Sequence, residues 1–435
     1  MTSPQADSVQ THEPSCDDAA AYPRQTARLY FDLSVFWFAL SFLWAGMLTI
    51  VVQRLIEQMA RPQKDLYLGW TLGLGALVAT VVVIIVGTIS DRSRWRMGRR
   101  RPYIILGGLL SVPPLVCLGA MGSVPLVVLD YCLIQFWVNI ATSPYQALIP
   151  DLVPRQHQGT ASAHMGIASL VGQLAGFIVC GLLITRPGGL WMVVIIYATL
   201  IFGLALYTAW RIPERSAADN PAPRVSVAQA VIESFRVSPR EHPDFFRLIA
   251  SRFIINMGFY TATQFLLYYV TDTLRAPRPV DTLAQILVIS TVSGLIGTFP
   301  AGKLSDRMSK KTVVYVSAGI TAAAALIFVL TSSIPVALAA AFVFGAGLGA
   351  FMAVDWAFAT NLLPERDQAK HMGIWHVAFT VPQVVAPVIG GLVAYFFNQH
   401  VGHGFGYRAV LSLVIVYFVL GTVMITPIKE RVRKP

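Results

Sequence analysis

The sequence predicts an all-α membrane protein with twelve transmembrane helices in two pseudo-symmetric six-helix halves. Three observations support this fold class. Of the 435 residues, 55% are hydrophobic and only 13% are charged, whereas soluble proteins carry about 25% charged residues. Apolar stretches of about 20 residues, the length that crosses a bilayer, recur along the chain. Two basic loops with the same Ser-Asp-Arg pattern stand in corresponding places of the two halves.

Each expected helix is an apolar stretch bounded by polar or basic residues. The stretches cover about residues 32–56, 69–90, 103–122, 124–149, 161–184, 190–210, 246–272, 283–305, 312–331, 334–360, 371–397 and 405–427. An even number of helices places both termini on one side of the membrane. The basic tail IKERVRKP is typical of a cytoplasmic end, because Lys and Arg concentrate on that side.

A long polar segment separates the two sets of six helices, and it defines the expected domains. These are a disordered cytoplasmic tail at 1–24, an N-terminal half at 25–210, a cytoplasmic linker at 211–245, a C-terminal half at 246–428 and a cytoplasmic tail at 429–435.

The net charge of +11 reflects topology rather than nucleic-acid binding. With the N-terminus inside, about 26 of the 33 Lys and Arg residues fall on one side of the membrane. The four cysteines show no paired spacing, so we expect no disulfide framework and no metal site. No cofactor is expected either, and the partners are the lipid bilayer and a small solute.

The most informative segment is the loop GTISDRSRWRMGRRRP at 87–102, which joins two apolar stretches. Arginine is very costly in hydrocarbon, so this loop lies in water or among headgroups, and the charge rule for short loops makes it cytoplasmic. A weaker copy, AGKLSDRMSKK at 301–311, follows 215 residues later, counted from Asp91 to Asp306.

Two further pairs match at nearly the same offset, namely Pro154 with Pro364 and His164 with His371. Three matches at nearly one offset indicate an internal duplication. Transporters built from such duplicated six-helix halves hold the substrate near the membrane midplane, between the halves. The sequence therefore predicts a duplicated transporter.

These motifs resemble the major facilitator superfamily over about residues 28–430. The basic loop, together with WAGMLTIVVQRL, SPYQALIPDL and TVPQV, resembles its sucrose-transporter-like branch, which includes plant sucrose–proton symporters and is related to the glycoside–cation symporters. The resemblance implies a secondary active transporter that moves a sugar or glycoside such as sucrose or maltose by alternating access, coupled to protons. It also implies a monomer, which we place in a bacterial inner membrane.

In the resembling family, the loop between helices 2 and 3 locks the cytoplasmic side while the outside is open. Carried over, this gate consists of Gly87, Asp91, Arg92, Gly98, Arg99 and Arg100, with Gly302, Asp306 and Arg307 as the counterpart in the second half. The alternative is that these arginines only set the topology.

Proton coupling needs a titratable group at membrane depth. Asp355, well inside helix 10 among apolar neighbours, is the first candidate, and Asp130 in helix 4 is the second. Sucrose-type symporters carry an acid sixteen positions before the Asp that closes helix 4. Counting back from Asp151 reaches Gln135, which cannot titrate. Either Asp130 or Asp355 replaces that acid, or coupling is weak, different or absent.

Sugars are bound by amides and carboxylates, with aromatic rings against their apolar faces. Polar groups are costly in lipid, so those inside helices are expected to face a cavity or another helix. The candidates for substrate binding are Gln53, Gln135, Asn139, Tyr145, Asn256, Tyr260, Gln264, Trp356 and Gln383. For each of them, hydrogen bonding between helices is the alternative.

The sequence is also compatible with two other functions. One is transport of a different small solute, such as a drug or an anionic metabolite, which Arg252 would favour if it faced the cavity. The other is a transport-inactive sensor or assembly factor on the same fold. An enzyme is not expected, because the sequence has no nucleophile–base pair, phosphate-binding loop or metal-ligand cluster.

Overall fold

The computed structural model describes residues 26–214, 216, 243–362 and 368–428, without the side chains of 155, 306–307, 356–357, 359–362 and 368–376. The two tails and most of the linker expected at 211–245 lie outside this part of the chain. The described residues form helices joined by short loops, so the all-α prediction is confirmed.

The N-terminal half holds the first six expected helices, several of them in pieces. Its elements are α2 (Ala27–Gly46), η1 (Met47–Val51), α3 (Val52–Met59), η2 (Arg61–Gln63), α4 (Lys64–Asp91), α5 (Arg101–Leu110), α6 (Val112–Cys117), η3 (Leu118–Ala120), α7 (Val124–Gln146), α8 (Leu148–Leu152), η4 (Arg155–His157), α9 (Gln158–Ile184) and α10 (Gly189–Arg211). The third expected helix is interrupted at Ser111. Pro113 and Pro114 lack backbone N–H groups, so they cannot continue the hydrogen bonds of α5.

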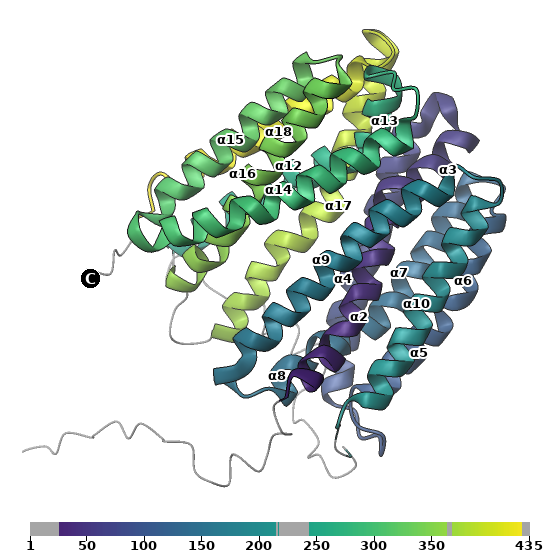
Figure 1. The fold of residues 1–435 in the computed structure, drawn as a ribbon, viewed down its shortest axis with the longest axis vertical. Coiled ribbons are helices and arrows are strands. Elements are labelled where there is room, and N and C mark those ends of the chain that lie inside the picture. The colour runs from purple at the N-terminus through teal and green to yellow at the C-terminus, as the bar shows by residue number, and fades with distance from the viewer. Residues whose placement is uncertain (1–25, 215, 217–242, 363–367, 429–435) are drawn as a thin grey trace, which may run out of the picture.

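The C-terminal half repeats this arrangement (Figure 1). Its elements are α12 (Pro243–Gln264), α13 (Leu266–Tyr268), η5 (Tyr269–Thr273), α14 (Pro279–Arg307), α15 (Lys310–Leu330), α16 (Ile334–Leu362), α17 (Gln368–His400) and α18 (Phe405–Met424). Helices 1 and 7 of the duplication each contain a π-helical turn, η1 and η5.

Among the described residues, eleven helices are long and apolar enough to cross a membrane. The remaining expected helix, helix 7 at about 246–272, corresponds to α12, α13 and η5. It is present, but it is broken at Phe265, and α12 carries Asp244, Arg247 and Arg252.

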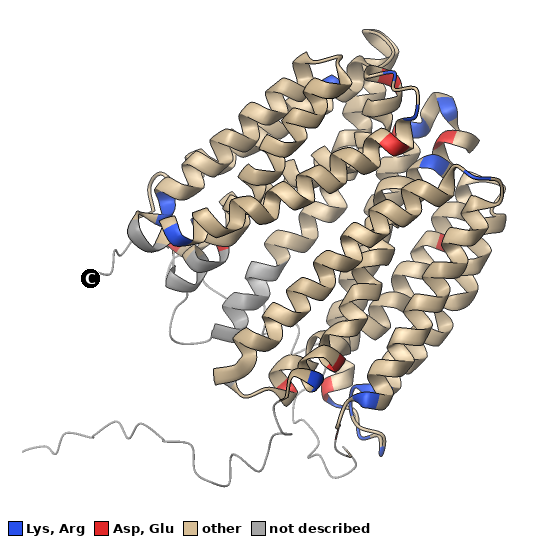
Figure 2. Ribbon diagram, in the orientation of Figure 1, with Lys and Arg blue, Asp and Glu red and all other residues tan. Residues whose placement is uncertain are grey.

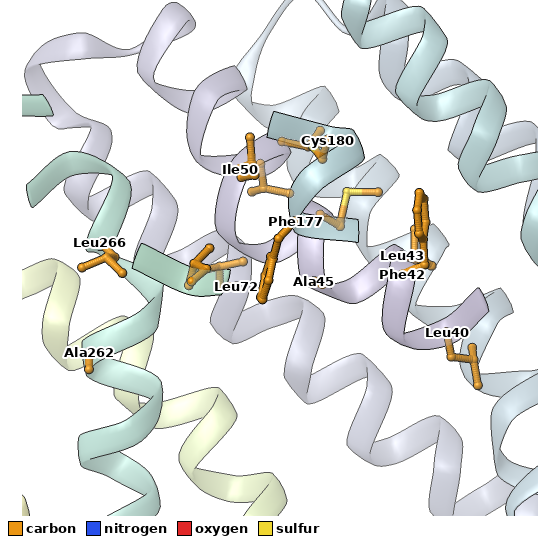
Figure 3. Packing of buried hydrophobic residues seen from close by; sticks show 14 of the residues in the cluster. Leu40, Phe42, Leu43, Ala45, Ile50, Leu72, Phe177, Cys180, Ala262 and Leu266 are labelled. Carbon is orange, nitrogen blue, oxygen red and sulfur yellow. The ribbon is translucent and has the colours of Figure 1, made fainter. Parts of the chain in front are cut away.

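Close packing within a half depends on small residues. In the pair α2 and α9, a side-chain carbon at Gly176 would lie 2.5 Å from the carbonyl oxygen of Phe42, so only glycine permits this approach. Phe42 and Ala45 of α2 lie near Phe177 and Cys180 of α9 in the buried cluster (Figure 3). This rigid pair forms one wall of the space between the halves.

The two halves pack against each other through α4 with α17 and through α9 with α14. The closest approaches are at one end of the molecule, where Gly69 meets the carbonyl group of Pro387 and Gly391 meets that of Asp65. Charged residues lie mainly near the two ends of the helices (Figure 2). We call the end with the loop 92–100 the basic end, and the end where α4 begins at Lys64 the opposite end.

Candidate functional site

A cavity of about 1420 Å³ lies between the halves. Along α4 it extends from Leu72 to Asp91 and Arg92, and the Asp91 side chain is 59% exposed. The cavity therefore opens at the basic end. At the opposite end, the tight contacts between α4 and α17 close it. A solute can enter this conformation from one side only.

One wall of the cavity is a polar stripe on α7. Tyr131, Gln135 and Asn139 follow one another at intervals of four residues, so they share a face of the helix. The amide nitrogen of Gln135 donates to the Tyr131 hydroxyl at 2.7 Å, and that of Asn139 donates to the side-chain oxygen of Gln135 at 3.0 Å. The stripe is thus ordered before any solute binds.

The C-terminal half supplies the facing polar groups. Tyr260 and Gln264 of α12 and Gln383 of α17 line the cavity, and the side chains of Tyr260 and Gln383 are hydrogen-bonded to each other. Five of the nine predicted substrate-binding residues, Gln135, Asn139, Tyr260, Gln264 and Gln383, are therefore brought to one cavity. Gln173 and Thr142 extend its polar lining.

Three of the predicted substrate-binding residues contact protein instead. Gln53 is fully buried, and its amide nitrogen donates to the carbonyl oxygen of Leu48 at 3.1 Å. Asn256 donates to the carbonyl oxygen of Ala378 at 3.1 Å, which ties α12 to α17. The Tyr145 hydroxyl bonds to the backbone of α2. The side chain of the ninth candidate, Trp356, lies outside the described residues.

Neither candidate for proton coupling lines the cavity. Asp355 is 5% exposed and forms an ion pair with Arg252, from α16 to α12 within the C-terminal half. Asp130 is equally buried, and no described group forms a hydrogen bond with its Oδ2 atom. A role in coupling stays a prediction for both residues.

The basic loop is held by carboxylates of its own half. Arg100 contacts Asp91 at 2.5 Å and Asp151 at 3.0 Å, and Arg99 contacts Asp151 at 2.6 Å. Ser90 donates to the carbonyl oxygen of Arg99 at 3.0 Å and accepts from the Arg100 guanidinium at 3.1 Å. Both Asp91 and Arg92 border the cavity. The side chains of Asp306 and Arg307, the predicted counterparts, lie outside the described residues.

Glu214 is an anchor of this loop that the sequence interpretation missed. Its carboxylate accepts the backbone N–H groups of Arg99, Arg100 and Arg101 at 2.7–3.0 Å, at the N-terminus of α5. A helix N-terminus favours negative charge because its first N–H groups have no partner within the helix. Gly98 has φ +105 and lies against this carboxylate, which explains a glycine there. The acid in IPERS, directly after helix 6, was the available signal.

Gly87 and Gly302 differ in their surroundings. A side-chain carbon at Gly87 would lie 3.0 Å from the Ser143 hydroxyl of α7, whereas no described atom lies within 4 Å of the corresponding point at Gly302. The first-half loop is therefore packed against its neighbours, and the described residues leave open space at Gly302.

The charge of the cavity limits what it can bind. Among the described lining residues, only Asp91 and Arg92 are charged, and both stand at the mouth. The remaining lining is made of amides, hydroxyls, aromatic rings and aliphatic side chains. Such a surface matches a neutral solute with hydrogen-bonding groups, because an ion would enter without a partner for its charge.

Comparisons with known proteins give a consistent picture. A family model described as "MFS/sugar transport protein" matches residues 64–367. The chain is 24% identical over 359 residues to the fujikurins efflux protein of Gibberella fujikuroi, covering 80% of this chain and 72% of that protein. It is 21% identical over 426 residues to the sucrose transport protein SUT5 of Oryza sativa, covering 80% and 79%. It is 22% identical over 383 residues to the multi-drug resistance efflux pump PmrA of Streptococcus pneumoniae, covering 85% and 90%.

Solved structures show the same fold at low identity. A bacterial homologue of the human lysosomal transporter Spinster, in an inward-facing and unoccupied conformation, superposes with a TM-score of 0.72 at 15% identity over 93% of this chain and 97% of that one. A mutant of the nucleoside transporter NupG gives 0.74 at 13% identity over 92% and 100%.

Proposed function

Because this chain belongs to the MFS/sugar transport family of the major facilitator superfamily, and is therefore a membrane transporter and not an enzyme, we propose that it carries a neutral sugar or glycoside. Transport proceeds by alternating access, in which the cavity opens to one side of the membrane at a time. The solute binds between the halves, near the middle of the helices.

The observation that carries this proposal is the neutral, amide-lined cavity. Gln135 and Asn139 on one side and Gln264 and Gln383 on the other supply both donors and acceptors, which hydroxyl groups need. Tyr131 and Tyr260 lie beside these amides and offer ring faces to the apolar side of a sugar ring. The same lining disfavours an anionic metabolite, since Arg252 forms an ion pair with Asp355 and does not line the cavity.

We extend the proposal to proton coupling through a carboxylate within the helices. Gln135 occupies the place of the family's helix-4 acid, so coupling falls to Asp355 or Asp130. Asp355 is favoured, because a change in its charge would directly alter its ion pair with the partly buried Arg252. Protonation would loosen this contact between α12 and α16, and α12 carries Tyr260 and Gln264 into the cavity.

The orientation follows from the charge distribution. Loops of membrane proteins that are rich in Lys and Arg face the cytoplasm, so we assign the basic end and both termini to the cytoplasmic side of a bacterial inner membrane. The cavity then opens inward in this conformation. We propose a monomer as the functional unit.

The test is uptake of labelled sucrose and maltose into proteoliposomes, with and without an inward proton gradient, for the parent and for Asp355→Asn. Gradient-driven uptake that is lost in the variant, while the variant stays folded and still binds the sugar, supports a proton-coupled sugar carrier. Uptake that does not depend on the gradient would support the sugar as substrate and contradict the proposed proton coupling. If neither sugar is taken up under any gradient, the substrate class is wrong.

A second candidate is export of a larger amphiphilic organic solute. The part of the lining that α15 and α16 contribute is apolar, with Phe328, Phe344, Leu348 and Met352. Two relatives are named as efflux proteins. Growth of an efflux-deficient host on a panel of neutral amphiphiles, with and without the protein, tests this alternative. Resistance without sugar uptake would favour export.

A further inference from the structure

A group of polar residues closes the cavity at the opposite end, away from the predicted gate loop. Lys64 and Asp65, the first two residues of α4, are only 4% and 5% exposed although both are charged. A buried charge is costly unless it is paired and hydrogen-bonded. The partners of this dipeptide therefore indicate what the structure gains by burying it.

Lys64 joins the two halves. Its ammonium group lies 2.6 Å from Glu57 in its own half and 2.7 Å from Asp272 in the other half. It also stands 4.4 Å above the ring centre of Tyr268, which belongs to the other half. An ammonium over an aromatic face is stabilised further by the charge distribution of the ring.

Asp65 is turned entirely toward the other half. The Tyr407 hydroxyl donates to its Oδ1 at 2.8 Å, and the amide nitrogen of Asn398 donates to its Oδ2 at 2.9 Å. The side-chain oxygen of Asn398 in turn accepts the backbone N–H groups of Gly404 and Gly406 at 3.0 and 2.9 Å. One carboxylate thus links α4 to the ordered loop between α17 and α18.

Asp65 differs in this respect from the other buried carboxylates. The described chain has four that are less than a tenth exposed, namely Asp32, Asp65, Asp130 and Asp355. Asp32 is bound by Tyr207 and Arg211 of its own half, and Asp355 by Arg252 of its own half. Of these four, Asp65 is the one whose described hydrogen bonds cross between the halves.

Two π-helical turns lie beside this contact. The π-helical turns η1 and η5 occupy corresponding places in helices 1 and 7, and π turns inside α-helices are frequent at functional sites. Tyr268 directly precedes η5, and Gln53 lies just after η1. The Tyr268 hydroxyl donates to the carbonyl oxygen of Gln53 at 2.8 Å. The two helices that contain π-helical turns therefore meet where the charged residues hold the halves together.

We propose that Lys64 and Asp65, with Asp272, Asn398 and Tyr407, form a cross-half latch that keeps the opposite end closed while the cavity is open at the basic end. The latch consists of one ion pair and one carboxylate held by two neutral donors. Opening to the other side requires both contacts to break and their groups to become hydrated. The latch and the basic loop therefore act at the two ends of the same cavity.

This inference rests on the proposed alternating access but not on the identity of the solute. Glu57 provides a matched control for Asp272, because both carboxylates contact the ammonium group of Lys64. Glu57 belongs to the same half as Lys64, whereas Asp272 belongs to the other half. Tyr417→Phe is the control for Tyr407→Phe, since both lie on α18 and the structure describes no hydrogen bond from the Tyr417 hydroxyl.

The experiment measures the opening of the opposite end directly. Spin labels are placed at Arg186→Cys and Ser333→Cys, two exposed positions in opposite-end loops of the two halves, in a background without the four native cysteines. The distances between the two spin labels are recorded in nanodiscs without solute. We expect Asp272→Asn and Tyr407→Phe to raise the long-distance population at least fivefold, and Glu57→Gln and Tyr417→Phe to match the parent.

The proposal is overturned if Asp272→Asn and Tyr407→Phe both keep the parent distances, or if Glu57→Gln opens this end as much as Asp272→Asn does. Tyr407→Phe removes a single oxygen atom, so it keeps the test valid even if the charge variants fold poorly. A failure of sugar uptake would not affect these distances. The two proposals can therefore fail independently.

Discussion

The hydroxyl of Tyr145 is inserted into the backbone hydrogen bonds of helix α2, next to Trp37. It accepts the N–H of Trp37 at 3.2 Å and donates to the carbonyl oxygen of Leu33 at 2.6 Å. In an uninterrupted helix, these two backbone groups would bond to each other. Side chains that insert in this way bend helices. Because Trp37 lines the cavity, Tyr145 of α7 positions a wall residue without lining the cavity itself.

Tyr145→Phe is expected to destabilise the protein by about 1 kcal/mol, because the inserted hydroxyl makes one buried and one partly buried hydrogen bond that the variant loses. Partial repair by a direct Leu33–Trp37 bond keeps the loss small. Thermal unfolding in detergent measures the effect, with Tyr417→Phe as the control. A melting temperature identical to that of the parent, together with unchanged tryptophan fluorescence, would mean that the inserted hydroxyl does not contribute to stability.

Gln264→Ala and Asn256→Ala should separate binding from stability, although both residues lie on α12. Gln264 lines the cavity, whereas Asn256 bonds to the backbone of α17. We expect Gln264→Ala to weaken solute binding about tenfold, roughly the 1.4 kcal/mol of one hydrogen bond, at unchanged melting temperature. Asn256→Ala should lower the melting temperature more than it weakens solute binding. Isothermal titration with the transported solute, beside thermal unfolding, distinguishes them, and equal effects on both properties would contradict the assignment.

The Arg252–Asp355 pair predicts a non-additive pattern of stability. Either Arg252→Met or Asp355→Asn alone leaves a charge or its partner buried without compensation, at a cost of about 3–5 kcal/mol. The double variant should be less destabilised than the sum of the two. A double-mutant cycle on melting temperatures measures this coupling. Additive losses would show that the two charges act separately.

Glu214 predicts a graded response at the basic loop. Glu214→Ala leaves three N–H groups of the α5 N-terminus without their carboxylate, and we expect a loss of about 1.5–3 kcal/mol. Glu214→Gln should cost less, because one acceptor oxygen remains. Hydrogen exchange of residues 98–102 reports the loosening locally.

Gly98→Ala should loosen the same loop by a different route, since φ +105 is unfavourable for alanine. Gly203→Ala is the matched control, because no atom of the described residues lies within 4 Å of its side-chain position. Unchanged exchange in both Glu214 variants would remove Glu214 from the loop's support.

Several features could be predicted because they depend on short stretches of sequence. Apolar length gave the helices, and the repeated Ser-Asp-Arg loops gave the duplication. The amides at 135, 139 and 264 were recognisable as candidates, because polar groups inside apolar helices need a partner or a cavity. The break of helix 7 at Phe265 was not predicted, since no proline marks it.

The amino-acid sequence by itself determined the fold class, the two halves and the set of polar residues available to the cavity. Local hydrophobicity and charge are sufficient for these, because the membrane imposes them on each segment separately. Only the tertiary structure decided which polar residues face the cavity, that Asp355 is paired with Arg252, and that Lys64 and Asp65 clamp the halves together. Those contacts join residues up to 342 positions apart, and they depend on helix rotation and on which end is closed.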